Sequence, residues 1–156
     1  MKKHSAGLLM YRRQGGTLEV LLAHPGGPFW AKKDPGVWSL PKGEYDESEA
    51  PLADAQREFL EETGFTSAEP FIPLGELKQP SGKVVSAWAF KGDCDPAAMV
   101  SNLFEMEWPP KSGKLQSFPE VDRVAWFGTA EAKRRIQPGQ RGFVDTLEQR
   151  LATGAS

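Results

Sequence analysis

The stretch from Pro51 to Gly64 constrains the fold of this chain more than any other part of the sequence. Proline suits the first position of a helix, where its missing N–H is not needed, and glycine suits the left-handed residue that ends one. Between them, one side of the helix carries an apolar stripe of Leu52, Ala55 and Phe59. The sequence therefore predicts an amphipathic helix over residues 52–63 that packs against other elements.

Apolar and alternating runs on both sides of this helix predict β-strands. The chain opens with two such runs, separated by a glycine-containing turn that is typical of a hairpin. The expected strands are 6–12, 18–24, 74–78, 84–90 and 121–127, with a weaker one at 99–108 and an extended segment at 37–40; the expected further helices are 129–135, capped by Thr129, and 143–151. This order favours an α/β (α+β) sandwich with helices on a mixed β-sheet.

The size and composition of the chain exclude several classes of protein. Its 156 residues suit one domain, and 19 Lys and Arg against 21 Asp and Glu leave a net charge of −2. This balance provides no overall basic field for nucleic acid, and no run approaches the roughly 18 apolar residues that span a bilayer. The single cysteine, Cys94, cannot form an internal disulfide. We expect a cytoplasmic monomer or homodimer, with no membrane partner and with nucleic acid disfavoured.

Three glutamates follow one another along a single side of the predicted helix. Glu58, Glu61 and Glu62 have the spacing i, i+3 and i+4, so their like charges repel, and the last two also oppose the helix dipole. A bound Mg²⁺ would reverse both effects, because this hard cation prefers carboxylate oxygens. The alternative is an acidic face that is simply solvated. Helix physics alone leaves both interpretations open.

The residues around these glutamates resemble the signature of the Nudix hydrolases, a family of MutT-like pyrophosphohydrolases. Every fixed position of the pattern G-x5-E-x7-R-E-U-x-E-E-x-G-U, where U is bulky and apolar, is matched by Gly43, Glu49, Arg57, Glu58, Phe59, Glu61, Glu62, Gly64 and Phe65. The resemblance covers residues 4–151 and leaves 152–156 as a flexible tail. It implies an α/β/α sandwich and metal-dependent hydrolysis of a nucleoside diphosphate derivative, with Mg²⁺ as the cofactor and Mn²⁺ as the alternative.

The resemblance also implies roles for individual residues. Glu58, Glu61 and Glu62 look like the metal ligands, with the Gly43 carbonyl as a backbone ligand, and either Glu61 or Glu62 as the catalytic base. Arg57 resembles the arginine that orients a catalytic glutamate. Glu49 looks like the salt-bridge partner of this arginine, and Gly64 is a structural member of the motif.

A further acidic ligand or base is expected from outside the motif. Glu120 precedes a predicted strand in a stretch that resembles the corresponding region of diadenosine polyphosphate hydrolases. The alternative interpretation is a turn residue paired with Arg123.

Substrate recognition requires cations for phosphates and flat rings for nucleobases. Candidate residues are Lys42, Lys32, Lys33, Trp30 and Trp38, although each aromatic side chain is also a candidate for the core. The run from Trp38 to Gly43 resembles diadenosine tetraphosphate hydrolases, which have a tyrosine after the motif that this chain lacks. Pro80 lies where ADP-ribose pyrophosphatases have a proline, and a hairpin turn explains it equally well.

These markers favour a nucleoside or dinucleoside polyphosphate, such as an NTP or diadenosine polyphosphate, as the small-molecule substrate. Three other functions stay open: hydrolysis of an ADP-ribose-type nucleotide sugar, removal of pyrophosphate from an RNA 5′ end, and non-catalytic nucleotide sensing.

Overall fold

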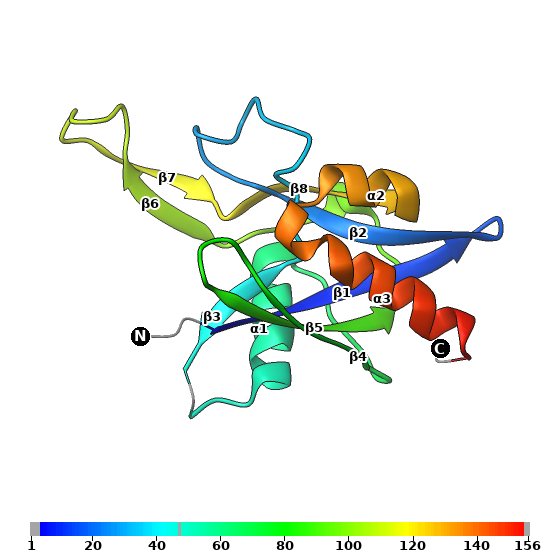
Figure 1. Ribbon diagram of the computed structural model, residues 1–156. Helices are drawn as coiled ribbons and strands as arrows, with labels where there is room; N and C mark the ends of the chain where they lie inside the picture. Colours follow the sequence, from blue (N-terminus) through cyan, green and yellow to red (C-terminus); the bar gives the residue numbers. More distant parts are fainter. Residues whose placement is uncertain (1–3, 47, 155–156) are drawn as a thin grey trace.

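A six-stranded mixed sheet with helices on both faces forms the body of the protein (Figure 1). The computed structural model describes residues 4–46 and 48–154. The elements are β1 (His4–Gln14), β2 (Thr17–Pro25), β3 (Lys42–Tyr45), α1 (Pro51–Thr63), β4 (Ile72–Lys78), β5 (Val84–Lys91), the 3₁₀ turn η1 (Pro96–Ala98), β6 (Leu103–Glu107), β7 (Leu115–Pro119), β8 (Val121–Gly128), α2 (Thr129–Arg135), the 3₁₀ turn η2 (Pro138–Gln140) and α3 (Arg141–Ala152).

The central strand of the sheet is β1. The strand order is β4-β5-β1-β2-β8, and β3 also pairs with β1. Strand β1 runs parallel to β5 and antiparallel to β2 and β3, so the sheet is mixed. Because β1 has neighbours on both edges and helices on both faces, it is apolar over most of its length.

Side chains of β1 alternate between two hydrophobic cores. Leu9 and Tyr11 point into a core that α3 completes with Phe143 and Leu147. The intervening residues, among them Leu8, point into a second core that α1 completes. This arrangement confirms the predicted α/β/α sandwich with a mixed sheet. It also places the acidic helix α1 on the face of the sheet opposite α3.

Three local predictions differ from the structure. The weak strand expected at 99–108 is only β6, and it pairs with an unpredicted β7 in a hairpin that projects from the main sheet (Figure 1). In β7 the first three residues are all exposed, so burial leaves no alternating pattern there, whereas β6 alternates between exposed and half-buried positions. Thr129 does not cap α2: the N-cap is Gly128, and no side chain caps this helix. The extended segment at 37–40 makes only isolated bridges, through Trp38 and Ser39.

The C-terminal helix runs slightly further than predicted. It ends at Ala152, the first residue of the expected tail, while residues 155 and 156 of that tail lie outside the described residues. Among the described helices, none combines the length and apolar character needed to cross a membrane.

Candidate active site

Helix α1 presents its glutamates because its opposite side is anchored in the core. Ala55 and Phe59 are fully buried, and the Phe59 ring meets Phe90 of β5 edge to face at a centroid distance of 5.3 Å. Gly64 ends the helix in the left-handed conformation at φ 80°, and its N–H donates to the Leu60 carbonyl at 2.8 Å. Both ends of α1 therefore match the sequence prediction, with Pro51 in the first turn.

The structure brings most of the predicted catalytic residues to one cavity. Its lining includes Lys42 and Gly43 from β3, Glu58, Glu61 and Glu62 from α1, and Glu120 from the turn between β7 and β8. The same cavity has three members that the sequence analysis missed, Glu44, Lys83 and Asn102. Glu44 directly follows Gly43 on β3, whereas Lys83 and Asn102 belong to no motif and reach the site only through the fold.

The acidic groups of this cavity disturb one another because they are close and partly buried. Burial, followed by repulsion from Glu58, raises the pKa of Glu62 to about 8. Burial and the neighbouring Glu61 also raise the pKa of Glu58, and burial raises the pKa of Glu120. Burial and the nearby Lys83 lower the pKa of Lys42. The cavity thus brings together five glutamates and two lysines, and burial disfavours the charged forms of several of them.

Gly43 lets Glu58 approach the backbone of β3. A Cβ on residue 43 would overlap the carboxylate of Glu58, so only glycine leaves room for this side chain. The close approach explains why a glycine lies fifteen residues before a helical glutamate. It also places the Gly43 backbone beside the carboxylate cluster, as expected for a site to which both contribute.

Arg57 contacts two of the glutamates of α1, Glu58 and Glu61. Its guanidinium donates to both oxygens of Glu61 at 3.1 Å and lies 3.3 Å from Glu58. The expected contact with Glu49 is present but long, at 3.9 Å between exposed groups. A much closer partner is Asp54, whose carboxylate is buried. The sequence analysis missed Asp54, although it lies at i−3 from Arg57, a spacing typical of helical ion pairs.

The donor set of the cavity fits a hard divalent cation by its chemistry. Carboxylate oxygens and a backbone carbonyl are the ligands that Mg²⁺ prefers. Within residues 4–46 and 48–154, no three Asp, Glu, His or Cys side chains converge closely enough to hold an ion. The reason is visible in the contacts, since Glu58 and Glu61 are turned toward Arg57. A cation at this site would therefore require these two side chains to turn.

Glu120 faces the carboxylate cluster and makes no contact with Arg123 in the structure. Arg123 instead pairs with Asp122 at 3.5 Å and with Asp34 at 3.8 Å. The alternative interpretation of Glu120 as the partner of Arg123 is thus wrong. Its backbone N–H donates to the Asn102 carbonyl at 2.9 Å, and the Asn102 N–H donates to the Glu61 carbonyl at 2.8 Å. These bonds connect the base of the β6–β7 hairpin to the end of α1.

Two more hollows continue from the acidic cavity. The first shares Lys42, Glu62 and Glu120 with it. The second, with a volume of about 490 Å³, shares Pro25, Val37 and Gln137 with the first, and is mainly apolar. Its size falls within the range of about 300–1,000 Å³ that is usual for small-molecule sites. Trp30, Pro80 and Pro138 are among its walls.

The predicted substrate-binding residues lie in different parts of the structure. Lys42 lies in the acidic cavity, and Trp30, which is 40% exposed, lies at the apolar pocket. Lys32 and Lys33 are both exposed and line none of the three hollows, although the Lys33 amine is 5.0 Å from the centre of the Trp30 ring. The proposal of Trp38 as a stacking platform needs correction. Trp38 is 2% exposed, because its ring packs against His24 and Phe127 in the core.

Comparison with known proteins agrees with this arrangement. The family model of the NUDIX domain matches residues 1–147. A comparison with curated proteins finds no significant match.

Solved structures with the same fold include several Nudix proteins. The NUDIX domain of Shewanella oneidensis NrtR, solved with ADP ribose, has a TM-score of 0.68 at 17% identity, covering 97% of this chain and 89% of that one. A C. elegans Ap4A hydrolase has a TM-score of 0.63 at 22% identity, with 97% and 98% covered. The Nudix hydrolase RenU of M. smegmatis has a TM-score of 0.61 at 22% identity, with 98% and 88% covered. Together with the family match, which spans most of the sequence, these likenesses lead to one conclusion: the chain belongs to the Nudix family, whose domain indicates a pyrophosphohydrolase of nucleotide derivatives.

Proposed function

We propose that this protein hydrolyses a phosphoanhydride bond in a nucleoside or dinucleoside polyphosphate with the help of Mg²⁺. The observation that supports this function best is the continuity of the three hollows. An acidic cavity with a partly buried lysine opens, through shared walls, to an apolar pocket bordered by a tryptophan. A polyphosphate with a nucleoside at one end needs this succession of environments, a charged region followed by a flat apolar one.

Carboxylates of the acidic cavity would hold the metal. We assign this role to Glu58, Glu61, Glu62 and Glu120, with the Gly43 carbonyl as a backbone ligand. A divalent cation bound there would supply charge to the phosphates and lower the pKa of a coordinated water. Lys42 lies in the same cavity and in the adjoining one, so its ammonium would bind a phosphate oxygen.

One glutamate of α1 would accept the proton of the attacking water. Glu61 is held through both oxygens by Arg57, whereas Glu62 lines both the acidic cavity and the hollow next to it. Glu62 is therefore the better placed of the two candidates. Arg57 would then act as a positioning residue that holds Glu61 and Glu58 beside the metal site until a cation binds them.

The proposal can be tested with a panel of nucleotides in ¹⁸O-labelled water. ATP, diadenosine tetraphosphate, ADP-ribose and a 5′-triphosphorylated RNA would be incubated with Mg²⁺ or Mn²⁺, and the labelled product would identify the attacked phosphorus. Glu62→Gln and Glu61→Gln should lower kcat by about 10²- to 10⁴-fold. Glu105→Gln, an exposed position on β6, is the matched control. Full activity of both cavity variants, or nucleotide binding without turnover in either metal, would contradict the proposal.

ADP-ribose is the second candidate substrate, because Pro80 lines the same apolar pocket as Trp30. The NrtR domain with the same fold was solved with ADP ribose, which supports including this compound. Formation of AMP and ribose 5-phosphate in the panel, at a higher kcat/KM than for the polyphosphates, would favour this alternative.

A further inference from the structure

The loop between β2 and the bridge at Trp38, residues 26–36, carries Trp30 to the edge of the apolar pocket. It contains turns but no helix or strand, so its position depends on individual contacts with the body of the protein. The Gly26 N–H donates to the Glu120 carbonyl at 2.9 Å at one end, and the Gly36 N–H donates to the Arg135 carbonyl at 2.9 Å at the other. The centre of the loop needs anchors of its own.

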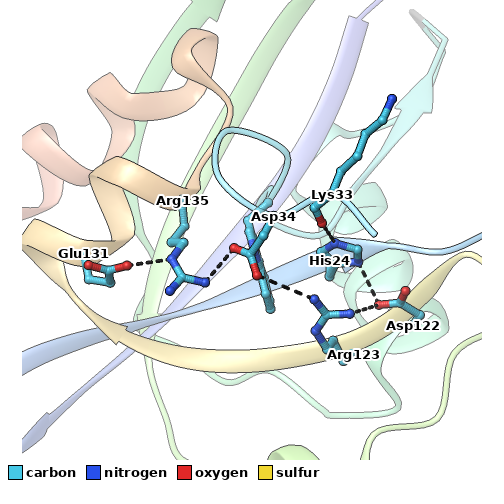
Figure 2. Close-up of polar contacts among 8 residues, drawn as sticks. His24, Lys33, Asp34, Asp122, Arg123, Glu131 and Arg135 are labelled. Atoms are coloured by element: carbon cyan, nitrogen blue, oxygen red, sulfur yellow. Dashed lines mark hydrogen bonds and ion pairs between the residues drawn. The ribbon is translucent and has the colours of Figure 1, made fainter. Parts of the chain in front are cut away.

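His24 supplies a central anchor from beneath the loop (Figure 2). This residue of β2 is completely buried, and its ring packs edge-on against Trp38 at a centroid distance of 5.1 Å. Nε2 lies 2.6 Å from the Lys33 carbonyl oxygen, and Nδ1 lies 2.9 Å from a carboxylate oxygen of Asp122 on β8. The ring therefore links the loop to two strands of the sheet.

The bond from His24 to the loop has a defined direction. A carbonyl oxygen only accepts, so Nε2 carries a proton that it donates to Lys33. The His24 ring is completely buried, whereas the Asp122 side chain on its other side is 25% exposed. Losing the bond to Lys33 would leave a buried polar group without its partner, so this contact favours the observed position of the loop.

Lys33 transmits this anchor to Trp30. Its backbone N–H donates to the Trp30 carbonyl at 2.9 Å, while its own carbonyl accepts from His24. The Lys33 side chain points away from His24 in Figure 2, and its amine lies over the Trp30 ring. One residue thus joins the buried histidine to the tryptophan at the pocket.

The charged groups around His24 support the same loop. Asp34 accepts from the Trp38 indole at 3.1 Å and from Arg135 at 2.5 Å, and it lies 3.8 Å from Arg123. Arg135 is held in turn by Glu131 on α2. Figure 2 shows this chain of contacts running from α2 through the loop to β8. Lys33 and Asp34 are therefore fixed side by side, from two directions.

We propose that His24 is a positioning residue for substrate binding, which holds Trp30 at the apolar pocket through Lys33. The assignment rests on the proposed function, because it takes the pocket to be the subsite for the nucleoside end of the substrate. His24 touches neither the acidic cavity nor its carboxylates. It therefore affects the binding of substrate and leaves the chemical step unchanged.

Two substitutions of His24 test separately its contact with Lys33 and its contact with Asp122. His24→Gln keeps a donor near the place of Nε2 and so retains the bond to Lys33, whereas His24→Asn keeps a polar group near Nδ1 and loses that bond. We expect His24→Asn to raise KM roughly tenfold, the effect of losing about one such hydrogen bond, with kcat within about twofold of wild type. His24→Gln should restore KM. His4→Asn, at the other histidine of the chain, is the matched control.

A second readout needs no activity. Trypsin cleaves after Lys32 and Lys33, both exposed in the loop, and mass spectrometry would follow the rate. Cleavage should be faster in His24→Asn and unchanged in His24→Gln and His4→Asn. Faster cleavage with an unchanged KM, or unchanged cleavage and KM, would overturn the proposal, as would a parallel fall in kcat. An inactive wild type would refute the proposed function, while the cleavage rates would still test the anchor.

A measurement on the wild-type protein tests the proposal even if the His24→Asn variant does not fold. The imidazole resonances of His24 should shift when Mg²⁺ and the imido analogue of ATP are added, because Lys33 couples the ring to Trp30. Saturating binding of this analogue without any such shift would overturn the assignment.

Discussion

The carboxylate of Glu58 lies directly against the backbone of Gly43, in space that any Cβ on residue 43 would occupy. This contact joins β3 to α1 at the point where the acidic cavity begins. It makes the position of a helical glutamate depend on the absence of one methyl group in a strand.

Gly43→Ala should therefore displace Glu58 and lower kcat by about 100-fold, a loss that a shift of about 1 Å causes at a catalytic site. Steady-state kinetics with Mg²⁺ would measure it, next to thermal unfolding to show that the variant is folded. The matched control is Gly128→Ala, where φ is −61° and the nearest atom would be 3.8 Å from the new Cβ. Equal kcat values for the two variants would contradict the steric argument.

Trp38 and Trp30 should respond to truncation in opposite ways. Trp38→Ala removes a core ring and its bond to Asp34, so the free energy of unfolding should fall by about 3–5 kcal/mol. Trp30→Ala removes a ring at the edge of the apolar pocket, so KM should rise while stability changes by less than about 1 kcal/mol. Urea unfolding and KM measurements on both variants would test this contrast. A large rise in KM for Trp38→Ala without a loss of stability would contradict the core assignment and indicate that Trp38 contacts the substrate.

Asp54 should matter more than Glu49 for the position of Arg57. The Asp54 carboxylate is buried against the guanidinium, whereas Glu49 is exposed and 3.9 Å away. Asp54→Ala should lower kcat by about 10- to 100-fold, the range seen when a residue that supports metal ligands is removed. Glu49→Ala should lower kcat by less than about threefold, because exposed ion pairs contribute little. The reverse order of effects would show that Glu49 is the true support of Arg57.

Cys94 should be slow to react with thiol reagents. Burial, and then the charge of Asp93, raises the pKa of the Cys94 thiol to about 11, so that the reactive thiolate is rare at pH 8. The rate of modification should rise with pH until the pH passes about 11. At pH 8, the native protein should react roughly 100-fold more slowly than the urea-unfolded chain, as expected for a pKa about two units higher. Equal rates in the two states would contradict an environment that disfavours the thiolate.

Local patterns were sufficient to predict α1 and most of the main sheet. The spacing of Leu52, Ala55 and Phe59 on α1 reflects burial on a single side, and Pro51 at the first helical position and Gly64 at the C-cap act within one turn of the chain. The strands of the main sheet are readable for the same reason, because their burial is regular. Strand β6 was predicted only weakly, since none of its side chains is buried, and β7 could not be predicted in this way, since its first three side chains are exposed.

The sequence alone identified the glutamates of α1 and Gly43 as site residues, because helical spacing and a fixed motif are properties of residues that are close in the chain. Only the folded structure decided that Lys83 and Asn102 join this cavity, that Trp38 lies in the core, and that His24 contacts the Lys33 carbonyl in the loop of Trp30. Each of these relationships connects residues from different strands or loops. Their distances are determined by how the strands pair and how the two faces of the sheet are covered, and no local sequence signal encodes these.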